Sequence, residues 1–315
     1  MLDPMKIAFV GAGGVGGVFG ARLAHAGCDV SFVARGAHLA AMQAGGLRLE
    51  SDAYGPLHVP RVTVTDDPAT IGLVDYVFLA VKLWDTEAAA AAIAPLVGPA
   101  TCVMSLQNGV MKDDILRDRF GSGSVMGAVV YVASHIARPG VVAQTGPMQR
   151  FVFGEHDGRR SPRAERLLEA LVGAGLQGEI SDDIRRTIWE KYVFVVALSG
   201  ATATMRSTIG PIRAHPQARA FLLELLHETV AVGRAHGVRL PENFADERLP
   251  FFDALPAAAT SSMHHDVEKG NRLEVSWLSG GVAQLGRAAG VPTPANRVVW
   301  DILALHAEGP GPLDK

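Results

Sequence analysis

The sequence has little cysteine, no long apolar run and no excess of charge of one sign. Its two cysteines, Cys28 and Cys102, are too few and too far apart for a disulfide scaffold, so we expect a reducing, cytoplasmic environment. The longest apolar stretch outside alanine runs, residues 192–198, is far shorter than the ~20 residues that span a bilayer, which predicts no membrane segment. The residues before Lys6 lack the zones of an export signal.

Charge and composition exclude two broad classes of protein. The 29 Lys and Arg residues nearly balance the 32 Asp and Glu residues, and the sequence shows no local basic stretch, so we expect no binding to nucleic acid. With 48% hydrophobic and 19% charged residues, the chain has the composition of a globular protein and not of a disordered one. Its 315 residues predict two domains at ~100 to 200 residues each.

In the first half of the chain, short β-branched runs alternate with alanine-rich stretches, which is typical of a parallel sheet covered by helices. The strands we expect are residues 6–10, 29–33, 62–65, 76–80 and 101–105, with helices at residues 14–26, 37–43 and 86–93. Apolar clusters predict strands or hairpins that extend this sheet between residues 125 and 154, then a helix at 161–172 and a strand at 176–180. Residues 1–180 are therefore predicted to form an α/β domain.

The second half, residues 181–315, is predicted to be an all-α domain. Ser181 with Asp182 and Asp183 has the composition of a helix N-terminus, and almost everything after it has a helical pattern. The helices we expect are roughly residues 182–199, 217–236, 261–268, 274–289 and 295–307. Gly280 lies inside the fourth of these, where close helix packing and close approach of a substrate are both open explanations.

A glycine-rich turn lies between the first strand and the first helix. Residues 11–16 have the pattern G-x-G-x-x-G, and the residues in this order are Gly11, Ala12, Gly13, Gly14, Val15 and Gly16. In this context the first glycine permits a tight turn, the second lets the backbone approach a pyrophosphate, and the third lets the helix pack on the strand. The helix N-terminus adds N–H donors for phosphates. We therefore expect a Rossmann-type dinucleotide site; glycines that serve only the turn are the alternative.

Two basic residues indicate which dinucleotide is bound. The second strand ends at Arg35, where an NAD site has an acidic residue for the ribose 2′-hydroxyl, and a guanidinium binds a 2′-phosphate instead. Lys82 follows the strand at 76–80 and lies where it can reach the same nucleotide, although a solvated surface lysine is an equal alternative. The cofactor we expect is NADPH.

The predicted helical domain contains a second group of polar residues. Lys191 interrupts an apolar helix face, either as a functional lysine or as one whose amine extends to solvent. Ser262 and Glu274 each lie near a predicted helix start, where capping is the alternative role. Adjacent His264 and His265 point to different faces of a helix, and no metal-ligand spacing accompanies them, so we expect no metal site. Glu228, with its neighbours, is expected on a solvated helix face.

With these landmarks the chain resembles the ketopantoate reductase (2-dehydropantoate 2-reductase) family from Lys6 to about Trp300. The landmarks are the glycine turn, residues 107–109 (Gln-Asn-Gly), 189–191 (Trp-Glu-Lys), 261–263 (Ser-Ser-Met) with Asp266, Glu274, and 290–296 (Gly-Val-Pro-Thr-Pro-Ala-Asn). The resemblance implies a Rossmann domain, a helical C-terminal domain and NADPH-dependent reduction of a 2-keto acid. The reaction implied is ketopantoate to pantoate, in pantothenate biosynthesis.

The resemblance also implies roles for individual residues. Lys191 corresponds to the family's general acid, and Asn108 to the asparagine near the nicotinamide and the substrate. Ser262 and Glu274 resemble the pair that binds the substrate and orients the lysine. A nearby ammonium suits this chemistry because hydride transfer leaves negative charge on the keto oxygen, which the ammonium stabilises and then protonates.

The substrate pocket departs from the family pattern at two positions. Pantoate-producing members commonly have asparagine four and eight residues after the lysine, where this chain has Val195 and Ser199. Loss of these hydrogen-bonding groups can shift preference to another keto acid. Two alternatives stay open: a related Rossmann and helical-domain dehydrogenase with a different substrate, and a non-catalytic NADP(H)-sensing protein. Whether the chain forms a homodimer is also open.

Overall fold

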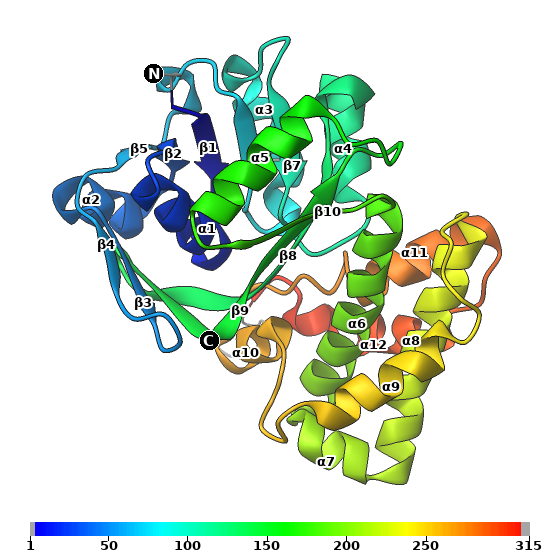
Figure 1. Ribbon diagram of the computed structural model, residues 1–315. Helices are drawn as coiled ribbons and strands as arrows, with labels where there is room; N and C mark the ends of the chain where they lie inside the picture. The colour runs from blue at the N-terminus through cyan, green and yellow to red at the C-terminus, as the bar shows by residue number, and fades with distance from the viewer. Residues whose placement is uncertain (1–3, 310–315) are drawn as a thin grey trace. The chain divides into compact units, whose positions relative to one another are not determined.

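The computed structural model describes residues 4–309 (Figure 1), which fall into two compact units. The sheet unit comprises the described residues up to 107 together with 111–187, and the helical unit comprises 108–110 and the described residues from 188 onward. The predicted fold class, a mostly parallel Rossmann-like sheet followed by a helical region, is confirmed. Among residues 4–309, no helix combines the length and apolarity needed to cross a membrane.

The first sheet of the sheet unit has five parallel strands in the order β5-β2-β1-β6-β7. These strands are β1 (Lys6–Val10), β2 (Asp29–Val33), β5 (Thr63–Thr65), β6 (Tyr76–Leu79) and β7 (Cys102–Ser105). Alternate residues of a strand point to opposite faces, so Ile7 and Phe9 pack in one core while Ala8 and Val10 pack in another. Because the strands are parallel, the loops after β1, β2, β6 and β7 all leave from the same edge.

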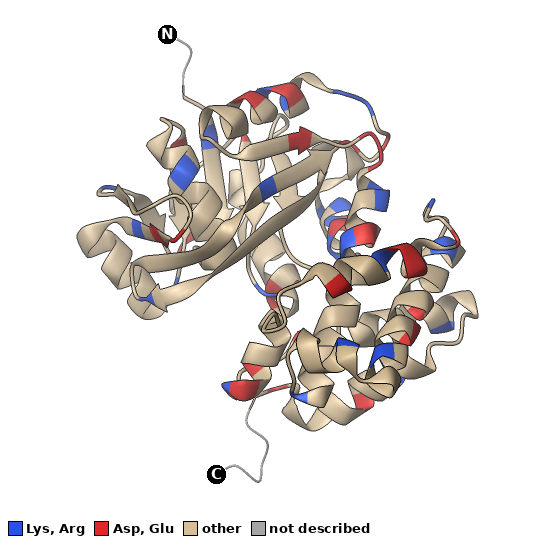
Figure 2. Cartoon of the chain, turned by 60° about the horizontal axis from the view of Figure 1, so that its bottom comes forward, with Lys and Arg blue, Asp and Glu red and all other residues tan. Residues whose placement is uncertain are grey.

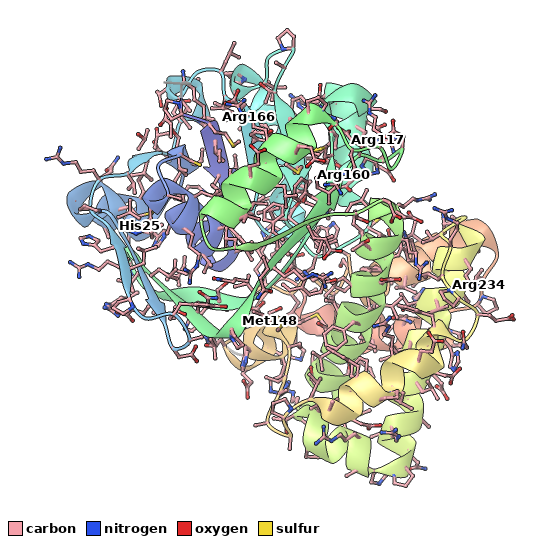
Figure 3. All side chains as sticks on the ribbon, viewed as in Figure 1. His25, Arg117, Met148, Arg160, Arg166 and Arg234 are labelled. Atoms are coloured by element: carbon pink, nitrogen blue, oxygen red, sulfur yellow. The ribbon has the colours of Figure 1, made fainter. Side chains whose placement is uncertain are left out.

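The helices of the sheet unit are α1 (Gly14–His25), α2 (Gly36–Gly45), α3 (Thr86–Ala92), α4 (Lys112–Phe120) and α5 (Pro162–Gly173). Helix α4 was not predicted, because its charged sequence has only a weak apolar periodicity. Figure 3 labels His25 in the last turn of α1 and Arg166 on α5. Arg166 pairs with Asp75, with 3.2 Å between Nη2 and Oδ2.

A long hairpin of β8 (Gly127–Arg138) and β9 (Val141–Gly154) belongs to a second sheet of the same unit (Figure 1). The prediction that this segment extends the first sheet was wrong, because β9 pairs along its length with other strands. Its first residues pair with β3 (Leu47–Ser51) and its last with β10 (Gln177–Ile180), while β4 (Leu57–Val59) pairs with β3. Strands β3 and β4 were not predicted at all. Met148, labelled in Figure 3, lies on β9 and is exposed.

The helical unit contains most of α6 (Ile184–Met205), followed by α7 (Ile209–Ala214), α8 (Pro216–Ala235), α9 (Phe244–Ala254), α10 (Ser262–Glu268), α11 (Ser279–Ala289) and α12 (Pro294–Leu303). Helices α7 and α9 were not predicted. Arg234, labelled in Figure 3, lies near the end of α8 and donates to the carbonyl of Leu240. In the view of Figure 2, acidic and basic residues are interspersed over the helices. Arg297 and Asp301 on α12 form an ion pair, with 2.8 Å between Nε and Oδ1.

The start of α11 differs from the prediction. We expected a helix from Glu274, but residues 271–278 form extended and turn structure and the helix begins at Ser279. The carbonyl of Glu274 accepts from the N–H groups of Trp277 and Leu278, which closes a single turn. The non-helical backbone of Leu278 (φ −87°, ψ −100°) separates this turn from α11. Gly280 allows close packing, because a Cβ there would lie 3.0 Å from the ring of Trp300, which would then have to shift. Of the two explanations for this glycine, close packing is the one the structure supports.

Candidate active site

The glycine turn follows β1 at the carboxyl edge of the first sheet, and two of its three motif glycines, Gly11 and Gly16, have a separate steric reason. Gly11 has a φ of +103°, and a Cβ there would lie 2.8 Å from the backbone of Ala80. A Cβ on Gly16 would lie 2.0 Å from the carbonyl oxygen of Gly11, so only glycine lets α1 pack this closely. Around Gly13, by contrast, there is open space within 4 Å among the described residues.

This arrangement fits a dinucleotide pyrophosphate. The open position at Gly13 is where a backbone must approach the phosphates, and a side chain would fill that space. Gly13 is also the N-cap residue of α1, a 12-residue helix, and no side-chain hydrogen bond caps its N-terminus in the described part of the chain. The first N–H groups of a helix and the helix dipole favour an anion at such a position.

Arg35 and Lys82 lie at the same edge of the first sheet as the glycine turn. Arg35 is the N-cap residue of α2, its side chain is 76% exposed, and its Nη2 atom lies 3.1 Å from Oδ2 of Asp85. Lys82 is half-buried after β6, with its Nζ atom 5.7 Å from the centre of the Trp84 ring. Both residues thus lie beside the turn that follows β1, in the order that the parallel sheet imposes.

A buried polar network that sequence reasoning missed fixes the loop after β7. The amide nitrogen of Gln107 donates to the carbonyl of Lys82 (3.1 Å) and to Oγ1 of Thr86 (2.8 Å). The amide oxygen of Gln107 accepts from the hydroxyl of Ser105 (2.7 Å). Lys112 is fully buried and donates to the carbonyl of Ser105 at 2.8 Å. The only sequence signal was a glutamine directly after a buried strand.

In the helical unit, Lys191 of α6 contacts Asn108. The Nζ atom of Lys191 donates to Oδ1 of Asn108 at 2.7 Å, and both side chains are half-buried. Residues 108–110 are far from α6 in the sequence, yet they pack with the helical unit, and Val110 contacts its core. The amide oxygen thus holds the ammonium in a fixed direction.

Glu274 lies in the turn before α11 and is only 8% exposed. This turn is attached to α6 through Tyr192, the residue after Lys191, whose hydroxyl donates to the carbonyls of Trp277 (2.8 Å) and Leu278 (2.7 Å). Burial raises the pKa of Tyr192 far above its usual range, so the hydroxyl keeps its proton. The tyrosine therefore fixes the turn that carries Glu274 against the helix that carries Lys191.

Ser262 is the exposed first residue of α10. The start of α10 is bound to α6 by its neighbours: Ser261 caps the helix and shares a 2.8 Å hydrogen bond with the hydroxyl of Thr202. The Nδ1 atom of His264 lies 2.9 Å from the carbonyl oxygen of Thr202. Ser262 thus lies at the end of a short helix that is held firmly on the lysine helix.

Val195 and Ser199 follow Lys191 on α6 at intervals of four residues, so the three lie on one face of the helix. Val195 is half-buried and packs against the core of the helical unit. Ser199 is buried, with 2% of its surface exposed. Lys191, Val195 and Ser199 therefore form a single stripe along α6 that begins at the ammonium of Lys191.

The remaining sequence candidates have structural explanations. Within residues 4–309, no three His, Cys, Asp or Glu side chains gather as a metal site. Residues 224–228 were expected on a solvated helix face; Glu224 and His227 are exposed as expected, but Glu228 is half-buried. Its carboxylate accepts from the backbone N–H groups of Ala295 (2.7 Å) and Asn296 (2.9 Å), so it caps the N-terminus of α12.

Comparison with known proteins assigns the chain to a family. The family model described as ketopantoate reductase PanE/ApbA matches residues 7–158, and the model for its C-terminal part matches residues 183–307. The 2-dehydropantoate 2-reductase of Mesorhizobium japonicum is 37% identical over 311 residues, which cover 92% of this chain and 94% of that protein. The chain belongs to the ketopantoate reductase family. It is thus an oxidoreductase of a family of NAD(P)H-dependent 2-keto acid reductases.

Solved structures of other proteins share this fold. The PanE/ApbA family ketopantoate reductase of Ralstonia eutropha is 34% identical, with a TM-score of 0.87, and the match covers 96% of this chain and 98% of that one. A D-mandelate dehydrogenase with NADH and anilino(oxo)acetate has a TM-score of 0.88 at 20% identity, covering 96% and 98% of the two chains. At that identity the similarity shows a shared fold alone.

Proposed function

We propose that this protein reduces 2-dehydropantoate (ketopantoate) to pantoate with NADPH. The observation that carries the proposal is the 2.7 Å hydrogen bond between Lys191 and Asn108, because it fixes a cation that can protonate a developing alkoxide. The relative from Mesorhizobium japonicum, a 2-dehydropantoate 2-reductase, supports the choice of substrate.

The glycine turn and Arg35 of the sheet unit support this choice of cofactor. We propose that the N–H groups around Gly13 bind the pyrophosphate and that Arg35 binds the adenosine 2′-phosphate. NADPH, when bound, supplies the hydride for the keto carbon. Arg35 must then exchange its ion pair with Asp85 for the phosphate; both side chains are accessible enough to solvent for the exchange. Lys82 adds positive charge beside the same nucleotide.

In the proposed reaction, Lys191 is the general acid. Negative charge develops on the keto oxygen as the hydride arrives, and the ammonium stabilises this charge and then donates a proton to the oxygen. Asn108 accepts a hydrogen bond from the Nζ atom through its amide oxygen, so the ammonium is already oriented before the reaction begins. Glu274, buried in the turn that Tyr192 attaches to α6, is proposed to orient the lysine.

The stripe below Lys191 is proposed to bind the rest of the substrate, with Ser262 as a further hydrogen-bonding group. Val195 offers an apolar surface and Ser199 a single buried hydroxyl. This half-apolar stripe favours a second candidate function, the reduction of another 2-keto acid with a larger apolar side chain, because the apolar Val195 offers no hydrogen bond that would select a polar substrate.

A panel of 2-keto acids tests both candidates. NADPH oxidation is followed with ketopantoate and with aliphatic and aromatic 2-keto acids, and each active pair is repeated with NADH. The highest kcat/KM with ketopantoate and NADPH supports the leading proposal, and a higher value with an apolar keto acid supports the second. Tight NADPH binding without oxidation by any keto acid, unchanged by Lys191→Ala, would indicate a sensor instead of an enzyme.

A further inference from the structure

His38 of α2 makes two hydrogen bonds to the backbone of two other segments in the sheet unit. Its Nε2 atom lies 2.9 Å from the carbonyl oxygen of Ala12, inside the glycine turn. Its Nδ1 atom lies 3.1 Å from the backbone nitrogen of Gly140, in the turn between β8 and β9. The imidazole is half-buried. One ring therefore connects the glycine turn, the start of α2 and the β8–β9 turn.

The partners determine the tautomer of this ring. A backbone N–H group only donates, so Nδ1 of His38 accepts from Gly140 and carries no proton. The neutral ring then has its proton on Nε2, and Nε2–H donates to the carbonyl of Ala12. Burial lowers the pKa of His38, which agrees with a ring that works in its neutral form.

The segments that the ring connects have little freedom of their own. Gly140 has a φ of +77°, a Cβ on it would lie 3.1 Å from Cβ of Ala41, and its carbonyl accepts from the N–H of Arg48 at 3.0 Å. On the side of β8, a Cβ on Gly14 would lie 2.5 Å from the carbonyl oxygen of Ser134. The glycine turn is thus packed against the hairpin, and the imidazole holds its Ala12 carbonyl.

We propose that His38 is a positioning residue for the dinucleotide, which holds the Ala12 peptide so that the neighbouring N–H groups face the pyrophosphate. This positioning role rests on the proposed binding of NADPH. His38 lies three residues after Arg35, the N-cap of α2, so the same ring fixes the helix start from which the guanidinium extends. Loss of its bond to Ala12 should weaken cofactor binding and leave the chemical step intact.

Two amide variants separate the bonds of the ring. In His38→Gln the amide nitrogen reaches the position of Nε2 and can donate to Ala12, whereas in His38→Asn the amide lies at the position of Nδ1 and cannot reach Ala12. We expect His38→Asn to raise the Kd and the KM for NADPH about tenfold, which is the effect of ~1.4 kcal/mol of lost binding. We expect His38→Gln to stay within about threefold of the wild type, and kcat at saturating NADPH to be unchanged in both.

The matched control is His58→Gln, because the Nε2 atom of His58 also lies 2.9 Å from a backbone carbonyl, that of Gly45 at the far end of α2. Kd values are measured by calorimetry for NADPH and 2′,5′-ADP, together with the thermal midpoint of each variant. Equal affinity for NADPH in His38→Asn and the wild type would overturn the proposal. The proposal would also be overturned if His38→Asn and His38→Gln weakened NADPH binding equally and lowered the thermal midpoint to match. A wild type that binds neither nucleotide would instead refute the proposed function.

Discussion

The Nζ atom of Lys191 lies 2.7 Å from Oδ1 of Asn108, although 83 residues separate the two in the sequence. The lysine comes from the second turn of α6 and the asparagine from the three-residue segment 108–110, which packs with the helical unit. The amide oxygen accepts a hydrogen bond from the ammonium and so fixes the direction in which it points. The relationship suits a group that must stabilise a negative oxygen and then protonate it.

The first prediction concerns this lysine. Lys191→Ala should lower kcat by about 10²- to 10⁴-fold, the usual contribution of a general acid, and should leave the Kd for NADPH nearly unchanged. Steady-state kinetics and calorimetry measure the two quantities. Lys269→Ala, which removes an exposed lysine after α10, is the control and should have wild-type activity. Near-normal turnover by Lys191→Ala would remove the residue from the mechanism.

Asn108 should act through Lys191. Asn108→Ala is expected to lower kcat by less than Lys191→Ala does, and the double variant should resemble Lys191→Ala alone, because residues that act as a unit are not additive. The measurement is a double-mutant cycle on kcat with the best keto acid of the panel. Additive losses would show that Asn108 contributes independently of the lysine.

The ion pair of Arg35 with Asp85 predicts opposite effects of two substitutions on cofactor choice. Arg35→Asp should narrow or reverse the preference for NADPH over NADH, because it replaces the group proposed to bind the 2′-phosphate. Asp85→Asn should raise the affinity for NADPH, because it removes the carboxylate that competes for the guanidinium at 3.1 Å. The ratio of kcat/KM values for the two cofactors is the measurement.

Asp114→Asn provides the matched control, since Asp114 pairs with Arg117 on the exposed surface of the same unit. It should leave the cofactor ratio unchanged. If the ratio of kcat/KM values for NADPH and NADH is unchanged in Arg35→Asp, Arg35 does not bind the 2′-phosphate.

Two half-buried histidines, His38 and His156, predict that the protein loses stability in mild acid. Burial lowers the pKa of His156, against the opposing charge of Asp113, and burial also lowers the pKa of His38. The unfolded chain therefore binds protons more readily, so the stabilisation is complete above pH ~6.5 and declines as the pH falls below it. Urea unfolding at pH 7.5 and 5.5 should give a smaller free energy of unfolding at the lower pH. His156→Gln should reduce that difference, and an equal or larger difference in the variant would contradict the assignment.

Ser261 predicts a link between helix capping and substrate binding. Ser261→Ala removes the cap of α10 and the hydrogen bond to Thr202, and should cost about 1 kcal/mol of stability. If Ser262 binds the substrate, the KM for the keto acid should also rise, because the end of α10 is no longer held on α6. Ser161→Ala, which removes a cap from α5, should lower stability without changing this KM. If the KM for the keto acid is equal in the two variants, Ser262 does not bind the substrate.

Local patterns in the sequence determined most of the elements. The strands at residues 6–10 and 29–33 have the predicted bounds, because a buried parallel strand is a short apolar run. The glycine turn was also readable, because the spacing of its G-x-G-x-x-G pattern lies within one strand–turn–helix segment of the sequence. Lys191 could be singled out because a charge inside an apolar helix face is a local anomaly.

Long-range pairing was decided only in the tertiary structure. The sequence indicated strands after residue 125, but their sheet depends on pairing between β9 and β3, about 90 residues earlier along the chain. The sequence predicted a solvated Glu228, but in the structure its carboxylate accepts hydrogen bonds at the N-terminus of α12. No sequence pattern singled out His38, whose ring forms hydrogen bonds with Ala12 and Gly140. A local pattern records which face of an element is apolar, whereas a hydrogen bond between distant segments depends on how the whole chain folds back on itself.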